Sequence, residues 1–242
     1  MSNPPKGLLA IWNDFDPGRL LEYEHWHTLE HVPERVWVPG MVCGRRYRAV
    51  GQSVPRYLTL YELEALDVLE RAEYVDLVVR PTPWSASMRP SFSNFQRQPC
   101  EILADSGVGN GGKLAVIRTN CATSLSPAAL RSFADNLLAR PSDQCVVRVR
   151  VGQVTSRGPQ ALVNHAMIAE GIEYLWAIES VESASADLEV GFEEAGKQAG
   201  VDARIHYVGV FEFLTQIDHM SVKAENRPPP RLDLMKQFCG MI

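Results

Sequence analysis

The sequence predicts an α+β protein in which two β-α-β-β-α-β units follow each other along the chain. Three observations support this prediction. The most glycine-dense segment, DSGVGNGG at residues 105–112, lies almost midway along the 242 residues and is typical of a linker. The same order of strand-like and helix-like segments can be traced on both sides of it. The pattern YLxxxE, which begins at Tyr57, recurs at Tyr174 with the same internal spacing.

The first half begins with GLLAIWN at 7–13, which is typical of a strand. Asp16 and Pro17 then provide a good N-cap and first helical residue, so a helix is expected from there to about Val32. Alternating apolar and polar residues predict the next strands, and a helical period predicts the second helix. These remaining elements are expected at 41–50 and 56–64 (strands), 66–79 (helix) and 93–104 (strand).

The second half repeats this order with different residues. Ser126 and Pro127 mark the start of a helix in the same way as Asp16 and Pro17. The elements are expected at 113–120 (strand), 126–139 (helix), 145–155 and 173–180 (strands), 185–200 (helix) and 204–217 (strand). The matching order favours a tandem duplication. The alternative is one continuous α+β domain with accidental echoes.

Each half alone makes one antiparallel sheet with helices on one face, the ferredoxin-like arrangement, and leaves an apolar face exposed. We therefore expect the two sheets to pack face to face within the chain as a barrel-like sandwich. The expected units are residues 1–108, residues 109–218 and a proline-rich tail at 219–242. The tail either crosses to a neighbouring subunit, covers an edge strand or is loose.

The composition argues against several classes of protein. The net charge of −5 is spread along the chain without a basic tract, which argues against nucleic acid as a partner. No run of about 18 apolar residues is present, so no transmembrane helix and no membrane partner are expected. The N-terminus lacks the pattern of a secretion signal. Five scattered cysteines without a CxxC pair indicate reduced thiols in a cytoplasm, and argue against a disulfide framework or structural zinc.

The most distinctive segment is EYEHWHTLEHVPERVWVPG at residues 22–40, which holds three of the six histidines. On a helical wheel, Leu21, Leu29 and Val32 fall within one arc, and this arc is expected to face the sheet. His25 lies in the middle of that arc, so it is predicted to be a lone imidazole on a core face.

His27 and His31 form an i, i+4 pair on the opposite side of the helix, with Glu24 one turn before His27. Three interpretations of the pair compete. HTLEH fits the zinc-binding H-x-x-E-H pattern, but no third ligand is evident, so no metal is expected. In the second interpretation, the pair moves protons on a small substrate in a pocket between helix and sheet. In the third, the pair belongs to an ordinary solvated helix face.

The segment HWHTLEHVPERVWVPGMVCGRRY at residues 25–47 resembles the signature of EthD-like proteins, which are small dimeric α+β barrels. Many of these carry a W-Y-x-x-E-H-x-P-E-R helix end, followed by P-G-F and a strand with R-R-Y. The matching residues are Trp26, Glu30, His31, Pro33, Glu34, Arg35, Pro39, Gly40, Arg45, Arg46 and Tyr47. The departures are His27 in place of Tyr, Thr28 in place of Asp or Asn, and Met41 in place of Phe. The resemblance covers residues 7–104, including PTPWSASMRPSF at 81–92, which resembles the loop before the last strand of such proteins.

The resemblance implies that the first half holds the site and that the second half is a degenerate copy retained to complete an intramolecular dimeric α+β barrel. The candidate catalytic residues are His31, with His27 or His25 assisting and Glu30 or Glu24 orienting. The candidate substrate-binding residues are Arg46, Arg45, Tyr47, Trp12, Trp26 and Trp84. Because strand side chains alternate, only one of the two arginines faces the helices. We expect this to be Arg46, binding a carboxylate or enolate, with Tyr47 pointing away.

The predicted function is a small-molecule enzyme that acts on an aromatic or lactone-like carboxylate by histidine acid/base chemistry, without a cofactor. The resemblance implies an isomerase, dehydratase, decarboxylase or cofactor-independent monooxygenase, and a shared fold does not decide among these. One alternative is a non-catalytic ligand-binding or assembly protein with the same barrel, and another is a haem- or metal-binding protein. An exposed edge strand and the habits of the superfamily favour a homodimer.

Overall fold

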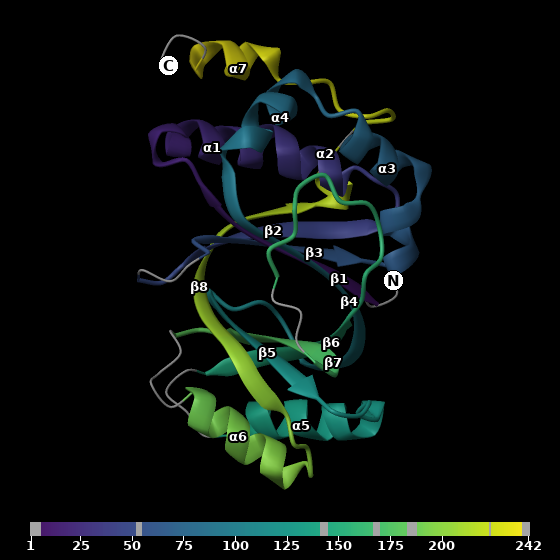
Figure 1. Ribbon diagram of the computed structural model, residues 1–242, viewed down its shortest axis with the longest axis vertical. Helices are drawn as coiled ribbons and strands as arrows, with labels where there is room; N and C mark the ends of the chain where they lie inside the picture. The colour runs from purple at the N-terminus through teal and green to yellow at the C-terminus, as the bar shows by residue number, and fades with distance from the viewer. Residues whose placement is uncertain are drawn as a thin grey trace.

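Eight antiparallel strands form a closed barrel at the centre of the molecule (Figure 1). The computed structural model describes residues 6–51, 55–140, 145–166, 170–182, 188–222 and 224–238. The strands are β1 Gly7–Phe15, β2 Met41–Ala49, β3 Tyr57–Leu63, β4 Phe92–Gly107, β5 Lys113–Cys121, β6 Val146–Val154, β7 Ile172–Ser180 and β8 Arg204–Asp218. Around the barrel they follow the order β1-β3-β2-β8-β5-β7-β6-β4. Every strand predicted from the sequence is present, and the mixed α+β class is confirmed.

The barrel closes because the outer strands of each half pair with those of the other half. β2 pairs with β8 from Cys43↔Asp218 to Ala49↔Phe211, and β4 pairs with β6. The structure therefore has one continuous sheet, whereas we expected two separate sheets packed face to face. Pairing satisfies backbone groups that an open edge would expose. The exposed edge that favoured a homodimer is accordingly absent from the described strands.

Four charged residues, the barrel quartet, lie inside the barrel: Arg45, Glu62, Arg150 and Glu179. Each is at most 5% exposed. Arg45 donates to Glu62 at 2.5 Å and to Glu179 at 3.2 Å, while Arg150 donates to Glu179 at 2.5 Å and also to Glu62. The two glutamates end the recurring YLxxxE pattern, so the sequence echo brings one carboxylate from each half to the same pair of guanidiniums.

Helices cover the outer face of the barrel on two opposite sides, with α1–α4 and α7 on one side and α5 and α6 on the other (Figure 1). Their bounds are α1 Leu20–Trp26, α2 Val32–Val36, α3 Ala72–Val79, α4 Pro83–Met88, α5 Pro127–Ala139, α6 Leu188–Gln198 and α7 Leu232–Phe238. Ser126 caps α5 as predicted. The expected loop at 81–92 instead contains α4, because Thr82 and Pro83 form another N-cap and first helical residue. Within the described residues, no helix is long and apolar enough to cross a membrane.

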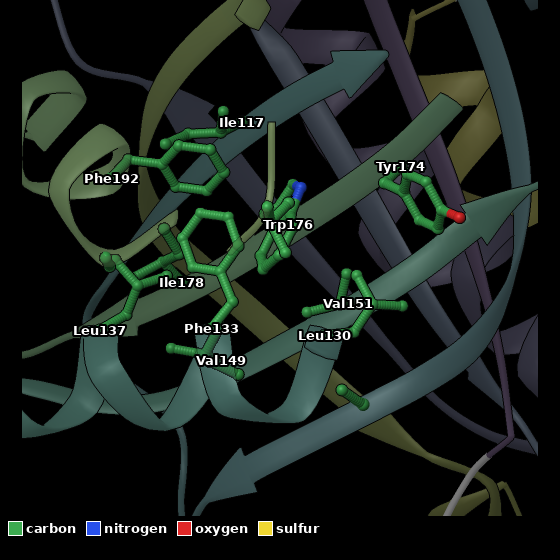
Figure 2. Packing of buried hydrophobic residues seen from close by; sticks show 14 of the residues in the cluster. Ile117, Leu130, Phe133, Leu137, Val149, Val151, Tyr174, Trp176, Ile178 and Phe192 are labelled. Carbon is green, nitrogen blue, oxygen red and sulfur yellow. The ribbon is translucent and has the colours of Figure 1, made fainter. Parts of the chain in front are cut away.

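The space between β7 and the helices of the second half is filled by aromatic side chains. Figure 2 shows Phe133 from α5 and Phe192 from α6 against Trp176 from β7. Their ring centroids lie 4.2 Å and 5.0 Å from that of Trp176, whose indole N–H donates to Thr119 at 3.0 Å. This position in the second half is therefore hydrophobic core.

The histidine-bearing helix does not follow the predicted wheel. α1 continues through a π-helical segment, His27–His31, directly into α2. Leu21 and Leu29, which we expected to face the sheet, are 62% and 43% exposed. His25 is only half-buried, and its Nδ1 lies 2.8 Å from the carbonyl oxygen of Leu21. The side that the wheel took as solvated, with His27 and His31, instead lines a cavity against the sheet, while α7 packs against α1 beside His25.

The C-terminal tail packs against the helices of the first half. Arg227 bonds to Glu34 at 2.7 Å, and the backbone N–H of Arg231 donates to Glu30 at 2.6 Å. α7 then lies against α1 (Figure 1). The tail thus covers helices of its own chain instead of an edge strand.

Candidate active site

A cavity lies between the outer face of β1–β4 and the helices of the first half. Its volume is about 100 Å³, the scale of a cavity of about 150 Å³ that holds one benzene ring. The polar and aromatic residues of its wall are Asn13, Trp26, His27, His31, Arg35, Thr59, Tyr61, Tyr74, Ser85, Arg89, Phe92, Phe95 and Arg97. None of the described wall residues is an aspartate or glutamate. The cavity is therefore mainly apolar, with only basic charged groups.

His27 and His31 lie side by side on this wall, with ring centroids 5.1 Å apart. The Nδ1 atom of each is buried and has no hydrogen-bond partner in the described part of the chain. Burial lowers the pKa of both imidazoles well below the ordinary value, and the nearby charges of Arg35 and Arg46 lower it further. Both rings are consequently neutral at pH 7 and face the cavity instead of solvent.

Three guanidinium groups on the wall, those of Arg35, Arg89 and Arg97, have no carboxylate partner among the residues described. Carbonyl oxygens of α3 accept from Arg35 at 3.3 Å and from Arg89 at 2.6 Å, and the carbonyl of Arg157 accepts from Arg97 at 2.8 Å. Arg35 and Arg97 are 8% and 7% exposed. None of the three was predicted to have a role, although Arg35 follows His31 at i+4, on the same side of a helix.

Arg46 points toward the helices and Tyr47 into the barrel, as strand alternation predicted. However, Arg46 donates to the Glu24 carboxylate at 2.7 Å and to the Thr28 hydroxyl, and it is not part of the cavity wall. Because Glu24 neutralises it, Arg46 is already occupied by the protein's own anion. The geometry therefore does not bring it to the place where a substrate anion would lie.

Of the other candidate residues, only Trp26 lines the cavity. Arg45, Tyr47 and Trp12 lie inside the barrel, and Trp84, His25 and Glu30 lie around the helices. Trp84 donates to Glu22 at 2.9 Å, and Glu30 accepts from Thr82 at 2.6 Å. The predicted set mixed the two faces of the sheet, because period-two alternation sends the side chains of β1 and β2 to both of them.

The segment between β6 and β7 crosses from the second half and covers the cavity. In Figure 1 it runs alongside the helices of the first half, and Pro159, Ala161 and Leu162 line the cavity. Asn164 fastens it to β4: its side chain accepts from the Arg97 N–H at 3.1 Å and donates to the Arg97 carbonyl at 3.0 Å. The length of this segment is the feature of the sequence that indicates a special role. Residues 155–171 join β6 to β7, whereas only residues 50–56 join the matching strands β2 and β3 of the first half.

Replacing Gly158 with alanine is expected to loosen this cover and to destabilise the protein by about 1–2 kcal/mol or more. Gly158 has φ +80, and a Cβ there would lie 2.8 Å from Arg97 Nη2 and 3.0 Å from the carbonyl oxygen of Leu69. Hydrogen exchange at the His165 amide, which donates to Phe95 at 2.8 Å, should become faster.

Gly109→Ala is the matched control, because Gly109 has a similar φ of +83 but nothing within 4 Å of its added Cβ. It carries the backbone strain without the clash, so exchange at His165 should stay as in the wild type. Equal exchange rates at this amide in both variants would contradict a close fit between the cover and Arg97.

No metal site is formed around the histidine pair: the described residues contain no group of three or more His, Cys, Asp or Glu side chains that could hold an ion. The HTLEH segment therefore has no complete ligand set within the described ranges.

Neither a known family model nor a curated protein matches this sequence. Solved structures do match. An anthrone oxidase-like protein covers 93% of this chain and 98% of its own, with a TM-score of 0.59 and 12% identity. A candidate monooxygenase from Lactobacillus acidophilus NCFM covers 88% and 97%, with a TM-score of 0.51 and 8% identity. A mutant chlorite dismutase from Candidatus Nitrospira defluvii, in complex with cyanide, covers 88% and 92%, with a TM-score of 0.51 and 9% identity. At these identities the matches show the fold alone: this chain has the fold of the dimeric α+β-barrel proteins.

Proposed function

We propose that this chain is a small-molecule enzyme in which His31 is the general acid/base, with His27 assisting, on an aromatic or lactone-like carboxylate. The observation that carries the proposal is a pair of neutral imidazoles, His27 buried and His31 half-buried, on the wall of a cavity whose charged groups among the described residues are all guanidiniums. A neutral imidazole accepts a proton, and a neighbouring guanidinium stabilises the anion that results. The EthD-like resemblance of residues 25–47 supports the same assignment.

The proposed chemistry is a proton transfer that forms or consumes an enolate-like anion. Such an anion is common to isomerisation, dehydration, decarboxylation and cofactor-independent oxygenation, the four reaction types that the resemblance implies. The guanidiniums interact more strongly with this anion than with a neutral carbonyl, and this difference is what accelerates a reaction. His27 lies beside His31 on the same wall, with ring centroids 5.1 Å apart, and takes the assisting role in this proposal.

We further propose that residues 1–108 and 109–218 are tandem ferredoxin-like units and that 219–242 is an added tail. The strand orders β4-β1-β3-β2 and β8-β5-β7-β6 support this, since they are the same order in each half. Thr59 and Trp176 then occupy matching positions, because each is the third residue of the YLxxxE pattern in its half. Thr59 lines the cavity, whereas Trp176 fills the corresponding space. The second unit also supplies the cover of the site, so it does more than complete the barrel.

Replacing His31 with asparagine is expected to lower turnover by about 10²–10⁴-fold, because the proton acceptor is lost. The assay is consumption of aromatic carboxylates and lactones from a panel, with the unfolding transition recorded in parallel. The unfolding midpoint should change little, since Nδ1 of His31 makes no hydrogen bond within the described structure. His25→Asn, on the same helix but outside the cavity, is the control and should keep full activity. Loss of the folding transition in His31→Asn would indicate a structural histidine instead.

A non-catalytic ligand-binding protein is the second candidate, and one observation favours it. A catalytic histidine is commonly oriented by a carboxylate or carbonyl, but Glu24 is bound to Arg46, and Glu30 is bound to Thr82 and the tail. This candidate predicts that the panel compounds bind but are not consumed, and that His31→Asn changes only their affinity.

The enclosed volume of this cavity is on the scale of one aromatic ring, which favours a ligand smaller than a porphyrin over the haem alternative. The homodimer stays a prediction that now depends on the superfamily alone. The cytoplasmic location also stays a prediction, with Cys43, Cys100 and Cys121 buried as free thiols.

A further inference from the structure

The charge inside the cavity is unbalanced. Arg35, Arg89 and Arg97 line it, no described wall residue is acidic, and each guanidinium is held by a neutral carbonyl. Glu34, the carboxylate whose charge acts on both Arg35 and Arg89, is itself bound to Arg227. Arginine does not lose its proton in proteins, so these charges remain when the cavity is empty. Burying cations without a partner is costly, and an anion in the cavity would offset that cost.

The carbonyl contacts hold the guanidiniums in place and leave donors free. Nη1 of Arg35 and Nη2 of Arg97 are buried and have no acceptor within the described ranges. A buried donor without an acceptor costs free energy, which an acceptor on a ligand restores. Two forked cations that each keep a free N–H are suited to a carboxylate, which accepts through both oxygens.

The rest of the wall suits a flat apolar ring. Trp26, Tyr74, Phe92 and Phe95 line the cavity, and its volume of about 100 Å³ limits the enclosed part of a ligand to roughly one ring. We propose that Arg35, Arg89 and Arg97 bind the carboxylate of a monocyclic aromatic acid here, an inference that rests on the proposed function of this site and names its substrate class.

Binding of such an acid changes the proton affinity of the histidines. Besides burial, the groups that lower the pKa of His31 are Arg35 from α2, Arg89 beyond α4 and Arg46 from β2. His27 faces Arg46, His31 and Arg35. A bound carboxylate offsets the charges of Arg35 and Arg89, so the pKa of His31 is higher in the complex than in the free protein. The complex then takes up protons as the pH falls through this raised pKa, and the affinity for the acid increases over the same range.

The test is isothermal titration of the full chain with benzoate and with benzamide, its neutral isostere. Benzoate should bind at least about tenfold more tightly than benzamide at low ionic strength, because only benzoate satisfies the guanidiniums. Equal affinities for the two probes, or no binding of benzoate, would overturn the inference.

Arg35→Gln and Arg97→Gln should each weaken benzoate binding by tenfold or more, and Arg89→Gln by less because Arg89 is only half-buried. The matched control is Arg80→Gln at the end of α3, whose guanidinium is 77% exposed and pairs with Asp76. This variant also removes one guanidinium charge, but the Arg80 side chain does not line the cavity. The affinity for benzoate should therefore be unchanged. Arg97→Lys adds a variant that keeps the charge but loses the fork, and it should bind with intermediate affinity. Wild-type affinity in Arg35→Gln and Arg97→Gln would contradict the proposed site.

This experiment separates the inference from the proposed function. His31→Asn should keep its benzoate affinity within about threefold at pH 8, where His31 is neutral, while losing turnover. If benzoate fails to bind but His31→Asn still abolishes turnover of a panel compound, the substrate is not a monocyclic aromatic acid. The present inference then fails, while the acid/base role of His31 stands. If benzoate binds as described but no panel compound is consumed, the anion site stands and the enzymatic role fails.

Discussion

Replacing Glu179 with glutamine is expected to lower the free energy of unfolding by about 3–5 kcal/mol, because it breaks the barrel quartet. Glu179 is fully buried, and it accepts from Arg45, from Arg150 and, at 2.8 Å, from the backbone N–H of Gly111. The substitution keeps the shape but leaves two guanidiniums with one carboxylate in a space that excludes water. Urea unfolding followed by circular dichroism measures the change, with the slope confirming two-state behaviour.

The charge-balanced double variant, Arg150→Gln with Glu179→Gln, is the control for this prediction. It removes one cation and one anion together, so it should lose less stability than the sum of the two single variants. Glu194→Gln, which breaks a largely exposed pair with Arg140, should have almost no effect. A Glu179→Gln protein within about 1 kcal/mol of the wild type would show that the quartet is not desolvated.

The quartet also predicts loss of stability in acid. Burial raises the pKa of Glu62, but Arg150 and Arg45 outweigh it and hold that pKa below its ordinary value. A depressed pKa in the folded state contributes stability above the unfolded pKa of about 4.3, and this contribution is lost as the pH falls through the folded value. Because this window lies at acid pH, the quartet does not account for any change in stability near neutrality.

Replacing Trp176 with threonine, the residue at the matching position of the first half, is expected to cost about 3–5 kcal/mol. Trp176 is fully buried between Phe133 and Phe192, and its removal leaves a cavity that their rings are too rigid to close. Thermal and urea unfolding measure the loss.

The reciprocal change, Thr59→Trp, should fill the cavity of the first half with little loss of fold. Overpacking costs roughly 1–3 kcal/mol, and the empty space should keep the cost near the lower end. Benzoate binding should fall at least tenfold, while Thr59→Val, which conserves volume, should keep it. If Thr59→Trp binds benzoate as the wild type does, the ligand lies elsewhere; if Trp176→Thr is as stable as the wild type, the two positions are not equivalent in packing.

Features that depend on neighbouring residues could be predicted from the sequence. The strands, the start of α5 after Ser126 and the opposite directions of Arg46 and Tyr47 all follow from alternation and capping, which act over a few residues. The placement of His27 and His31 in a pocket was one of three open interpretations, because the period of a helix shows which residues share a side but not what covers it.

The sequence by itself determined the order of the elements, the echo between the halves and the segment that holds the histidines, since each is encoded by residues close together in the chain. Only the tertiary structure decided that the strands close into one barrel, that a segment of the second half covers the cavity, and that Arg46 is neutralised while Arg35 and Arg97 are not. The physical reason is that strand pairing, burial and ion pairing join residues that are distant in sequence. Whether an arginine is free to bind a ligand depends on which carboxylates the fold brings to it.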